Sequence, residues 1–316
     1  MRVKCPVAAF MTAIVTGISL GHPASTVEQD ITTGGLHGTL SMPTGVGPVP
    51  AMLILAGSGP VDGNGNLPGA QNNSLKLLAQ EFSEMGISSL RVDKRGVAAS
   101  KGAATREEDL RFDTYVNDAV AWVQVLRAQP RVAKAIVLGH SEGALVATFV
   151  AQRGGVDGLV LLARAGEPAV RIIERQLSAA GVATAFQEQS RHIATSLERG
   201  VTVASIPPGL MALYRPSVQN YLMSWLPLDP VTELSKVTCP ALVLQGTTDL
   251  QVSVDDASRL ASSLQGSTLL LLEGMNHILK VAPIDRQKNL ITHTMPDLPF
   301  APALVPAIVA FVRTLP

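Results

Sequence analysis

Short apolar runs alternate with helix-length segments along most of this 316-residue chain, and this alternation limits the fold most strongly. The runs are nearly continuous in Val, Ile and Leu, as expected of strands that are buried on both faces. Strands joined by helices form right-handed crossovers, so we expect an α/β fold with a mostly parallel, doubly wound sheet. The predicted strands are 36–42, 51–56, 88–92, 135–138, 158–163, 241–245 and 268–272, and the predicted helices are 112–128, 142–152, 255–264 and 304–313.

One stretch, residues 166–236, interrupts the alternation because it contains no clear strand. We interpret it as a helical lid inserted between the two parts of the core, 25–165 and 237–316. Its large apolar side chains either line an acyl pocket or pack the lid onto the core, and packing is the commoner role. These side chains are Met211, Tyr214, Tyr221, Met223 and Trp225.

The first 24 residues have the pattern of a secretory signal peptide. Arg2 and Lys4 precede an apolar run over residues 6–20, and no acidic residue occurs before Glu28. The run is short for a membrane helix, which needs about 20 residues. We therefore expect removal of 1–24, export to the periplasm or the medium, and no stable membrane insertion afterwards. An uncleaved N-terminal anchor is the alternative.

The composition excludes several classes of protein. Lys plus Arg and Asp plus Glu both number 25, so the chain lacks the basic excess of a nucleic-acid binder. Hydrophobic residues make up 47% and charged residues 16%, which is sufficient for a large core. Cys5 lies in the predicted signal peptide, which leaves Cys239 with no partner for a disulfide. The sequence suggests no metal site and no organic cofactor, and it leaves the oligomeric state open.

The pentapeptide Gly139-His140-Ser141-Glu142-Gly143 carries the strongest chemical signal. It lies between a predicted strand and a predicted helix, where a sharp turn needs small residues on both sides of the serine. Such a turn exposes the serine hydroxyl at a helix N-terminus, whose amides favour developing negative charge. Ser141 is therefore the candidate nucleophile.

A serine hydroxyl needs a base to take its proton. His277 follows the last predicted strand in a flexible turn, Glu273 to His277, at the carboxyl edge of the sheet, where a base is expected. The backbone of the tight turn is expected to point His140 away from the neighbouring hydroxyl. The remaining histidines lie in the signal segment, an early strand, a lid helix or a polar loop: His22, His37, His192 and His293.

An acid that orients the imidazole is expected after the penultimate strand. Asp249 ends the segment Gly246-Thr247-Thr248-Asp249 there, and its other interpretation is a turn or helix-capping aspartate. The order Ser141, Asp249, His277 along the chain is that of one serine-hydrolase architecture. Agreement among three separate placements is a stronger signal than the pentapeptide alone.

A tetrahedral intermediate also needs hydrogen-bond donors for its negative oxygen. The segment Ala56-Gly57-Ser58-Gly59-Pro60 follows an early buried strand, and its glycines allow the backbone to approach a ligand closely. We expect the backbone amides of Ser58 and Glu142 to form the oxyanion hole.

With these motifs the sequence resembles an α/β-hydrolase over nearly the whole mature chain. Three segments resemble bacterial exported esterase-like hydrolases that are often described by similarity to serine aminopeptidases (S33-type). They are Gly57 to Asp62, Asp93-Lys94-Arg95-Gly96 and Asn276 to Lys280. The resemblance implies Ser141 as nucleophile, Asp249 as acid and His277 as base. Relatives commonly have histidine at the position of Ala56, and Asp93 and Arg95 match a turn that we interpret as structural.

The leading hypothesis is a serine hydrolase that cleaves small carboxylic esters through an acyl-enzyme, with a small-molecule ester as its only expected partner. An aminopeptidase or amidase needs a carboxylate cluster in the lid, and a thioesterase needs a basic cluster for coenzyme A. The sequence shows neither cluster clearly. A non-catalytic binder on this scaffold would normally lack one member of the triad. The lid acids Glu167, Glu174, Glu188 and Glu198 are scattered.

Overall fold

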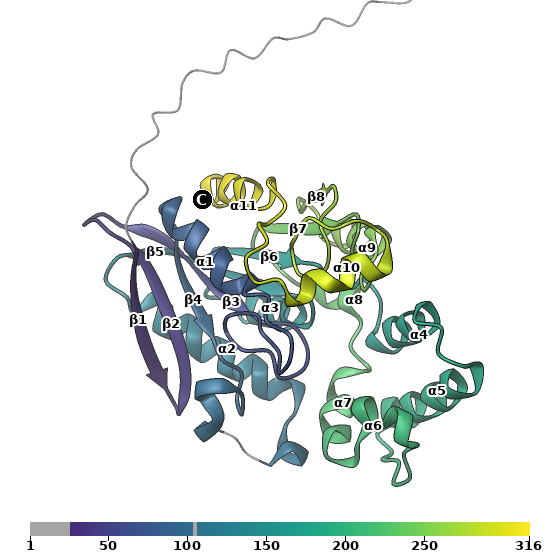
Figure 1. Cartoon of the computed structure of the whole chain (residues 1–316). Coiled ribbons are helices and arrows are strands. Elements are labelled where there is room, and N and C mark those ends of the chain that lie inside the picture. The colour runs from purple at the N-terminus through teal and green to yellow at the C-terminus, as the bar shows by residue number, and fades with distance from the viewer. Residues whose placement is uncertain (1–25, 104–105) are drawn as a thin grey trace, which may run out of the picture.

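The computed structural model describes residues 26–103 and 106–316, so the predicted signal peptide at 1–24 lies outside the described residues. Within them, eight strands form one sheet in the order β1-β2-β4-β3-β5-β6-β7-β8 (Figure 1). β2 pairs antiparallel with β1 and with β4, and the other neighbours pair parallel. The strands are β1 (Thr26–Thr33), β2 (Leu36–Pro43), β3 (Val49–Leu55), β4 (Ser88–Val92), β5 (Val132–His140), β6 (Gly158–Leu162), β7 (Ala241–Gly246) and β8 (Thr268–Leu272). The predicted α/β fold with a mostly parallel sheet is confirmed.

Helices connect the strands and cover both faces of the sheet. The longer ones are α1 (Ser74–Glu84), α2 (Phe112–Arg127), α3 (Glu142–Gln152), α4 (Ala169–Ala179), α5 (Thr184–Glu198), α9 (Val254–Ser263) and α11 (Leu304–Thr314). The shorter ones are α6 (Met211–Tyr214), α7 (Gln219–Trp225), α8 (Pro230–Leu234) and α10 (Arg286–Ile291). No helix in the two described ranges is both long and apolar enough to cross a bilayer.

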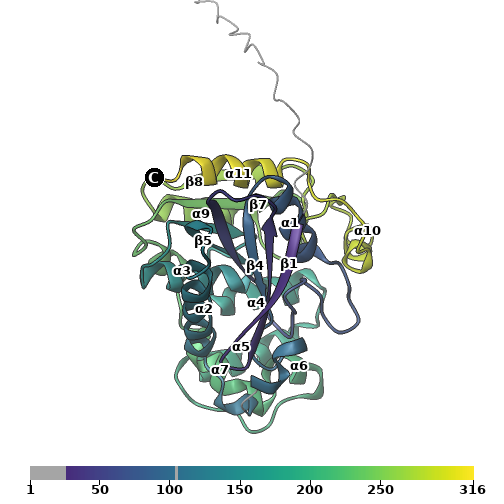
Figure 2. The same ribbon diagram turned by 90° about the vertical axis from the view of Figure 1, so that its left-hand side faces the viewer.

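The two faces of the sheet bury separate hydrophobic clusters because side chains alternate along each strand. On β3, Leu53 packs with residues of α2 and α3, whereas Met52 and Ile54 pack with residues of α1 and α11. Figure 2 shows the sheet between α2 and α3 on one side and α1 on the other. This two-sided cover explains why the central strands read as continuous apolar runs.

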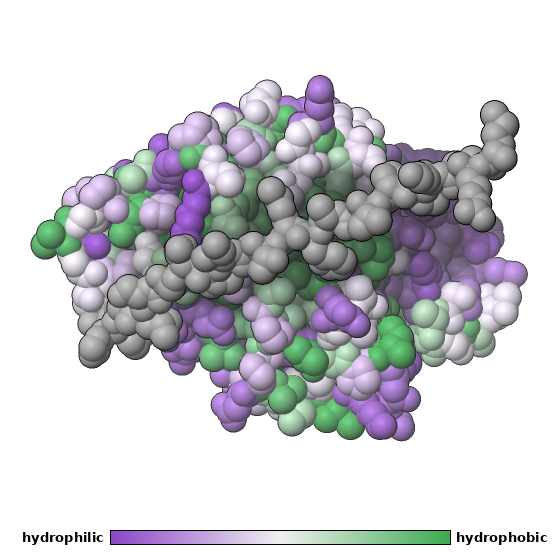
Figure 3. All heavy atoms as spheres, turned by 90° about the horizontal axis from the view of Figure 1, so that it is seen from above, coloured by the Kyte–Doolittle hydropathy of each residue, from purple (hydrophilic) through white to green (hydrophobic). Residues whose placement is uncertain are grey.

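The two edges of the sheet differ from the prediction. β1 was not predicted, because its sequence TVEQDITT is polar and most of its residues are exposed. β8 was predicted to be buried on both faces, and this is wrong: Leu270 and Leu271 are exposed because β8 is the edge strand of the sheet that the described residues form. The side of the molecule that carries β8 and α11 mixes hydrophobic and hydrophilic residues where it is visible (Figure 3).

Helices α4 to α8 lie between β6 and β7, within the range 166–236 that the sequence singled out. In both views α4 to α7 form a group beyond the carboxyl ends of the strands (Figures 1 and 2). The group is attached to the core near the start of α2, where the Phe112 amide donates to Ser224 Oγ at 2.8 Å. Arg215 also forms an ion pair with Glu107. These contacts hold the helical segment over the edge of the sheet at which β5, β6 and β7 end.

Candidate active site

The turn between β5 and α3 holds Ser141 in a strained backbone conformation, with φ 54° and ψ −119°. A positive φ is rare for residues other than glycine and is tolerated where surrounding packing enforces it. A Cβ on Gly139 would lie 2.2 Å from the Gly143 carbonyl oxygen, and one on Gly143 would lie 2.4 Å from the Leu55 oxygen. The two glycines therefore allow the close approach that lifts Ser141 out of the sheet.

Asp249 and His277 are brought together from the ends of the neighbouring strands β7 and β8. His277 Nδ1 lies 2.8 Å from Asp249 Oδ2, and both side chains are buried. Because an ionised carboxylate only accepts hydrogen bonds, Nδ1 carries the proton and donates it. His277 Nε2 has no hydrogen-bond partner among the described residues, so its lone pair faces away from the aspartate and is available to a proton donor.

Three further donors hold the Asp249 carboxylate. The backbone amides of Gln251 and Val252 donate to Oδ1 at 2.7 and 3.0 Å, and Gln245 Nε2 donates to Oδ2 at 3.1 Å. Burial by itself raises the pKa of Asp249, but the charge and hydrogen bond of His277 and the two amides outweigh it, so the pKa lies below its ordinary value. Asp249 is thus a buried carboxylate that stays ionised.

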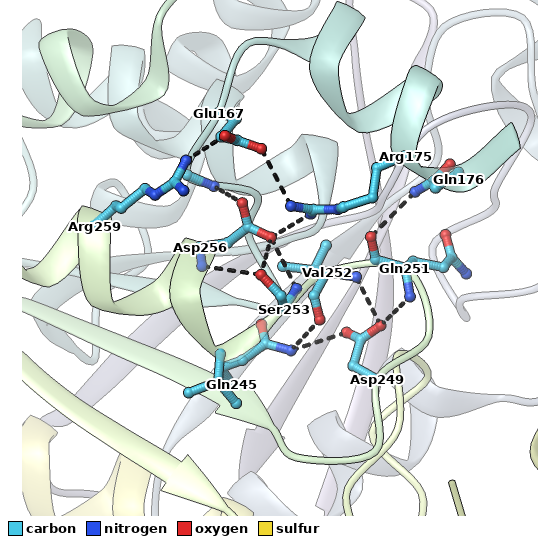
Figure 4. Close-up of polar contacts among 12 residues, drawn as sticks. Glu167, Arg175, Gln176, Gln245, Asp249, Gln251, Val252, Ser253, Asp256 and Arg259 are labelled. Carbon is cyan, nitrogen blue, oxygen red and sulfur yellow. Dashed lines mark hydrogen bonds and ion pairs between the residues drawn. The ribbon is translucent and has the colours of Figure 1, made fainter. Parts of the chain in front are cut away.

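A polar network joins the Asp249 loop to the helical segment (Figure 4). Asp256, in the first turn of α9, accepts hydrogen bonds from the Ser253 amide and hydroxyl at 2.8 and 2.7 Å and from the Gly166 amide at 3.1 Å, and it pairs with Arg175 of α4. Glu167 in turn pairs with Arg175 and Arg259. Asp256 is a second buried carboxylate close to the site, but these partners engage it, whereas Asp249 meets His277.

His140 has a role that the sequence did not reveal. It does not act on the Ser141 hydroxyl; its Nε2 lies 2.7 Å from the backbone oxygen of His277, and the two imidazole rings are 4.9 Å apart. Since a carbonyl oxygen only accepts, Nε2 of His140 carries a proton. Burial and the neighbouring His277 lower the pKa of His140 to about 3, so it is a neutral ring that anchors the His277 loop.

The remaining histidines lie apart from this pair or outside the described residues. His37, on β2, lies 3.3 Å from Asp30 and 3.6 Å from Asp93, and His192 is exposed on α5. Burial lowers the pKa of His293, and the nearby His277 lowers it further. His22 lies outside the described residues.

The glycine-rich loop after β3 packs directly against the nucleophile. A Cβ on Gly57 would lie 3.2 Å from Ser141 Cβ. The Lys94 ammonium donates to the Gly57 carbonyl oxygen, and Lys94 Nζ lies 5.8 Å from the centre of the Tyr115 ring. Burial lowers the pKa of Lys94, and the Glu142 carboxylate partly opposes this. Lys94 supports the loop from a position two residues after β4.

The two neighbours of Lys94 make structural contacts. Asp93 accepts hydrogen bonds from the amides of Gly63 at 2.7 Å and Ala99 at 3.0 Å. Arg95 forms a two-pronged ion pair with Asp118. Both side chains tie loops to the core, in agreement with the structural interpretation of this turn.

A cavity of about 490 Å³ opens over Ser141. Its lining includes Ser58 and Glu142 together with residues of the helical segment, among them Ile172, Leu222 and Trp225. Of the apolar residues singled out in the sequence, Tyr221 and Trp225 line this cavity. Tyr214 is instead fully buried against Ser190, Met211 is exposed, and Met223 packs on the core. No group of three or more His, Cys, Asp or Glu side chains in residues 26–103 and 106–316 is arranged to hold a metal ion.

The depressed pKa of His140 predicts a pH-dependent contribution to stability. In the unfolded chain His140 binds a proton below about pH 6.5, whereas in the folded protein its pKa of about 3 keeps the ring neutral down to about pH 3. Stability is therefore complete above pH 6.5 and falls as the pH decreases toward 3. His140→Gln keeps an N–H donor without a titrating group. Between pH 7.5 and 4.5 its free energy of unfolding, measured in urea, should therefore decrease by about 1–2 kcal/mol less than that of wild type. Equal losses would show that His140 protonates freely.

Residues 70–221 match a family model described as serine aminopeptidase, S33. The chain is 30% identical over 278 residues to the esterase EstD of Thermotoga maritima, an alignment that covers 84% of this chain and 65% of that protein. It thus spans a little less than two thirds of the length of the curated relative.

Solved structures with the same fold cover nearly the whole chain. Est1E from Butyrivibrio proteoclasticus, solved with ferulic acid, aligns with a TM-score of 0.58 and 16% identity over 90% of this chain and 100% of its own. The enol-lactonase of Burkholderia xenovorans aligns with a TM-score of 0.54 and 17% identity over 90% and 100%. With the sheet order and the strand-turn-helix geometry around Ser141, these matches show that the chain has the α/β-hydrolase fold.

Proposed function

We propose that this protein is a serine hydrolase that cleaves small carboxylic esters through an acyl-enzyme intermediate. The observation that carries the proposal is the 2.8 Å contact between His277 Nδ1 and Asp249, which leaves Nε2 unengaged. His140, the residue before Ser141, binds the backbone oxygen of His277, and Ser141 itself lines a cavity. The relative from Thermotoga maritima is named an esterase, which supports the same reaction class.

In the proposed mechanism His277 Nε2 removes the proton from Ser141 Oγ as the oxygen attacks the ester carbonyl carbon. Asp249 holds the imidazole in the tautomer with its proton on Nδ1 and stabilises the imidazolium that forms. His277 then protonates the leaving alcohol, and water repeats the two steps on the acyl-enzyme. His140 acts as a positioning residue, because it fixes the backbone carbonyl of the base.

The backbone amides of Ser58 and Glu142 are the proposed oxyanion donors, and Lys94 positions the first of them. Ser58 N–H and Gly57 C=O belong to one peptide unit, and in a trans peptide they point in opposite directions. Lys94 donates a hydrogen bond to the Gly57 carbonyl oxygen, and by holding this peptide unit it fixes the direction of the Ser58 amide. This contact offers the loop a support that does not need the histidine that relatives have at position 56.

We also propose that residues 166–236 act as a lid that sets specificity. The walls of the cavity include side chains from α4 and α7, in particular Ile172 and Trp225. Ion pairs attach this segment to the core at two points, Arg215 with Glu107 and Arg175 with Asp256. The apolar walls suit a short hydrocarbon chain.

An aminopeptidase or amidase on the same triad is the second candidate, because the matching family model is described as a serine aminopeptidase. A carboxylate cluster for a substrate amino terminus has little support. Glu167 and Glu174 are engaged by arginines, and Glu188 and Glu198 are exposed. Aminoacyl anilides tested beside p-nitrophenyl esters decide between the two activities.

Export to the periplasm or the medium is a proposal that rests on the first 24 residues. The basic start and the following apolar run are its support. Cell fractionation with N-terminal sequencing of the mature protein tests it: recovery of full-length protein from the cytoplasm contradicts export.

The triad is tested with substitutions and a fluorophosphonate probe. Ser141→Ala should abolish labelling, and Ser141→Ala and His277→Ala should each lower kcat on p-nitrophenyl butyrate by about 10⁵-fold or more. Asp249→Asn should cost less, on the order of 10²–10⁴-fold, because the wrong tautomer of His277 is then favoured. Asp255→Asn, an exposed change in the first turn of α9, serves as the matched control. Normal turnover in Asp249→Asn would mean that another residue is the acid.

The role of Lys94 is tested with Lys94→Met, which keeps most of the packing volume and removes the donor. Turnover (kcat) should fall about 10-fold or more, with little change in KM, because the Ser58 amide is aligned for the transition state. Circular dichroism and the stoichiometry of fluorophosphonate labelling check that the variant is folded. An unchanged kcat would show that Lys94 only packs the loop.

A further inference from the structure

Arg164 follows the carboxyl end of β6 and lines the same cavity as the proposed nucleophile. The Ser141 amide donates to the Leu162 carbonyl at 2.9 Å, two residues before Arg164. Ala163, between Leu162 and Arg164, is fully buried and has a positive φ of 48°, so the chain turns sharply where it leaves the sheet. Arg164 and Ser141 line the same cavity of about 490 Å³.

The Arg164 side chain has no partner for its charge. The residue is 7% exposed, and its guanidinium forms no hydrogen bond or ion pair with any residue that the structure describes. The other arginine of the cavity, Arg215, pairs with Glu107. A guanidinium has five N–H donors, and a buried charge without hydrogen bonds is costly. Because Arg164 lines the cavity, these donors face space that a ligand can enter, and such a ligand can supply the missing acceptors.

The nearby carboxylates do not fill this role. Glu142 and Asp256 are close enough to interact with the Arg164 charge, but neither lies within ion-pair distance of it. Asp256 is engaged by Ser253 and Arg175. Burial lowers the pKa of Arg164 to about 10, so the side chain remains a cation at neutral pH.

We propose that Arg164 is a substrate-binding residue that selects esters carrying a second, ionised carboxylate. The inference rests on the proposed esterase function and names its substrate class. A guanidinium binds a carboxylate through two parallel hydrogen bonds, which fixes both position and orientation. The apolar walls at Ile172, Leu222 and Trp225 would hold the short hydrocarbon link between the carboxylate and the ester carbonyl. A cation at this place also disfavours the ammonium group of an aminopeptidase substrate.

Two pairs of esters test the proposal, and they distinguish a carboxylate on the acyl side from one on the alcohol side. The acyl pair is mono-4-nitrophenyl glutarate and 4-nitrophenyl pentanoate, and the alcohol pair is 4-acetoxybenzoate and its methyl ester. In wild type, kcat/KM for the anionic member of one pair should exceed that of the neutral member. In Arg164→Met the ratio of anionic to neutral kcat/KM should fall about 10- to 100-fold, which is the loss expected for a charged hydrogen-bonded pair. The fall should come from a lower kcat/KM of the anionic ester. The ratio of Arg164→Lys should lie between those of wild type and Arg164→Met.

Arg191→Met is the matched control, because it removes the same charge from an exposed position on α5 outside the cavity. Its ratio should equal that of wild type. If Arg164→Met does not fold, competition on wild type replaces it: glutarate should inhibit hydrolysis of 4-nitrophenyl pentanoate competitively, and glutaramide should not.

The outcomes separate this inference from the proposed function. Equal kcat/KM for anionic and neutral esters, or an unchanged ratio in Arg164→Met, overturns the role of Arg164 while ester hydrolysis stands. A folded wild type that hydrolyses no ester and does not react with fluorophosphonate overturns the proposed function itself.

Discussion

The contact between His277 and Asp249 depends on how the ends of β7 and β8 pack, and the geometry of the site depends on that contact. Gly246 pairs with Leu272 at the last position of the parallel ladder. A Cβ on Gly246 would lie 2.0 Å from the Met275 carbonyl oxygen, so the two loops after the strands touch without intervening side chains. The Thr248 amide also donates to that oxygen at 3.1 Å. The loops that carry the acid and the imidazole are therefore one packed unit.

Backbone contacts extend this unit to the nucleophile and to the helical segment. His140 binds the backbone oxygen of His277, and the Ser141 amide binds that of Leu162, so β5, β6 and the His277 loop converge on one point. Asp256 links the Asp249 loop to Gly166 and Arg175 at the start of the helical segment. Positioned groups of this kind favour charge separation, because they need little reorganisation during reaction.

Much of this arrangement was predictable from the sequence, since the features concerned are local. Buried parallel strands appear as apolar runs, the glycines around Ser141 mark a tight turn, and strand order places Asp249 and His277 at one edge. The polar strand β1 escaped prediction because its partner β2 and the exposure of the edge decide its conformation. The exposure of β8 was not predicted, because an apolar run in the sequence does not show whether another strand lies beside it.

The roles of single polar residues depend on contacts distant in sequence and were missed for that reason. His140 meets a carbonyl 137 positions later, and Lys94 meets one 37 positions earlier. Arg164 looked like an ordinary residue at the end of a strand, and only burial without a partner distinguishes it. His140 and Lys94 lie in segments that the sequence singles out, but no local pattern reveals the distant carbonyl that each one binds or the missing partner of Arg164.

A crystal structure of the protein after reaction with diethyl p-nitrophenyl phosphate would show whether Ser141, His277 and Asp249 act together. We expect phosphorus bonded to Ser141 Oγ, the phosphoryl oxygen within hydrogen-bond distance of the Ser58 and Glu142 amides, and the imidazole of His277 between the serine oxygen and Asp249. Phosphorus on another side chain, or an imidazole turned away from the modified serine, would contradict this expectation.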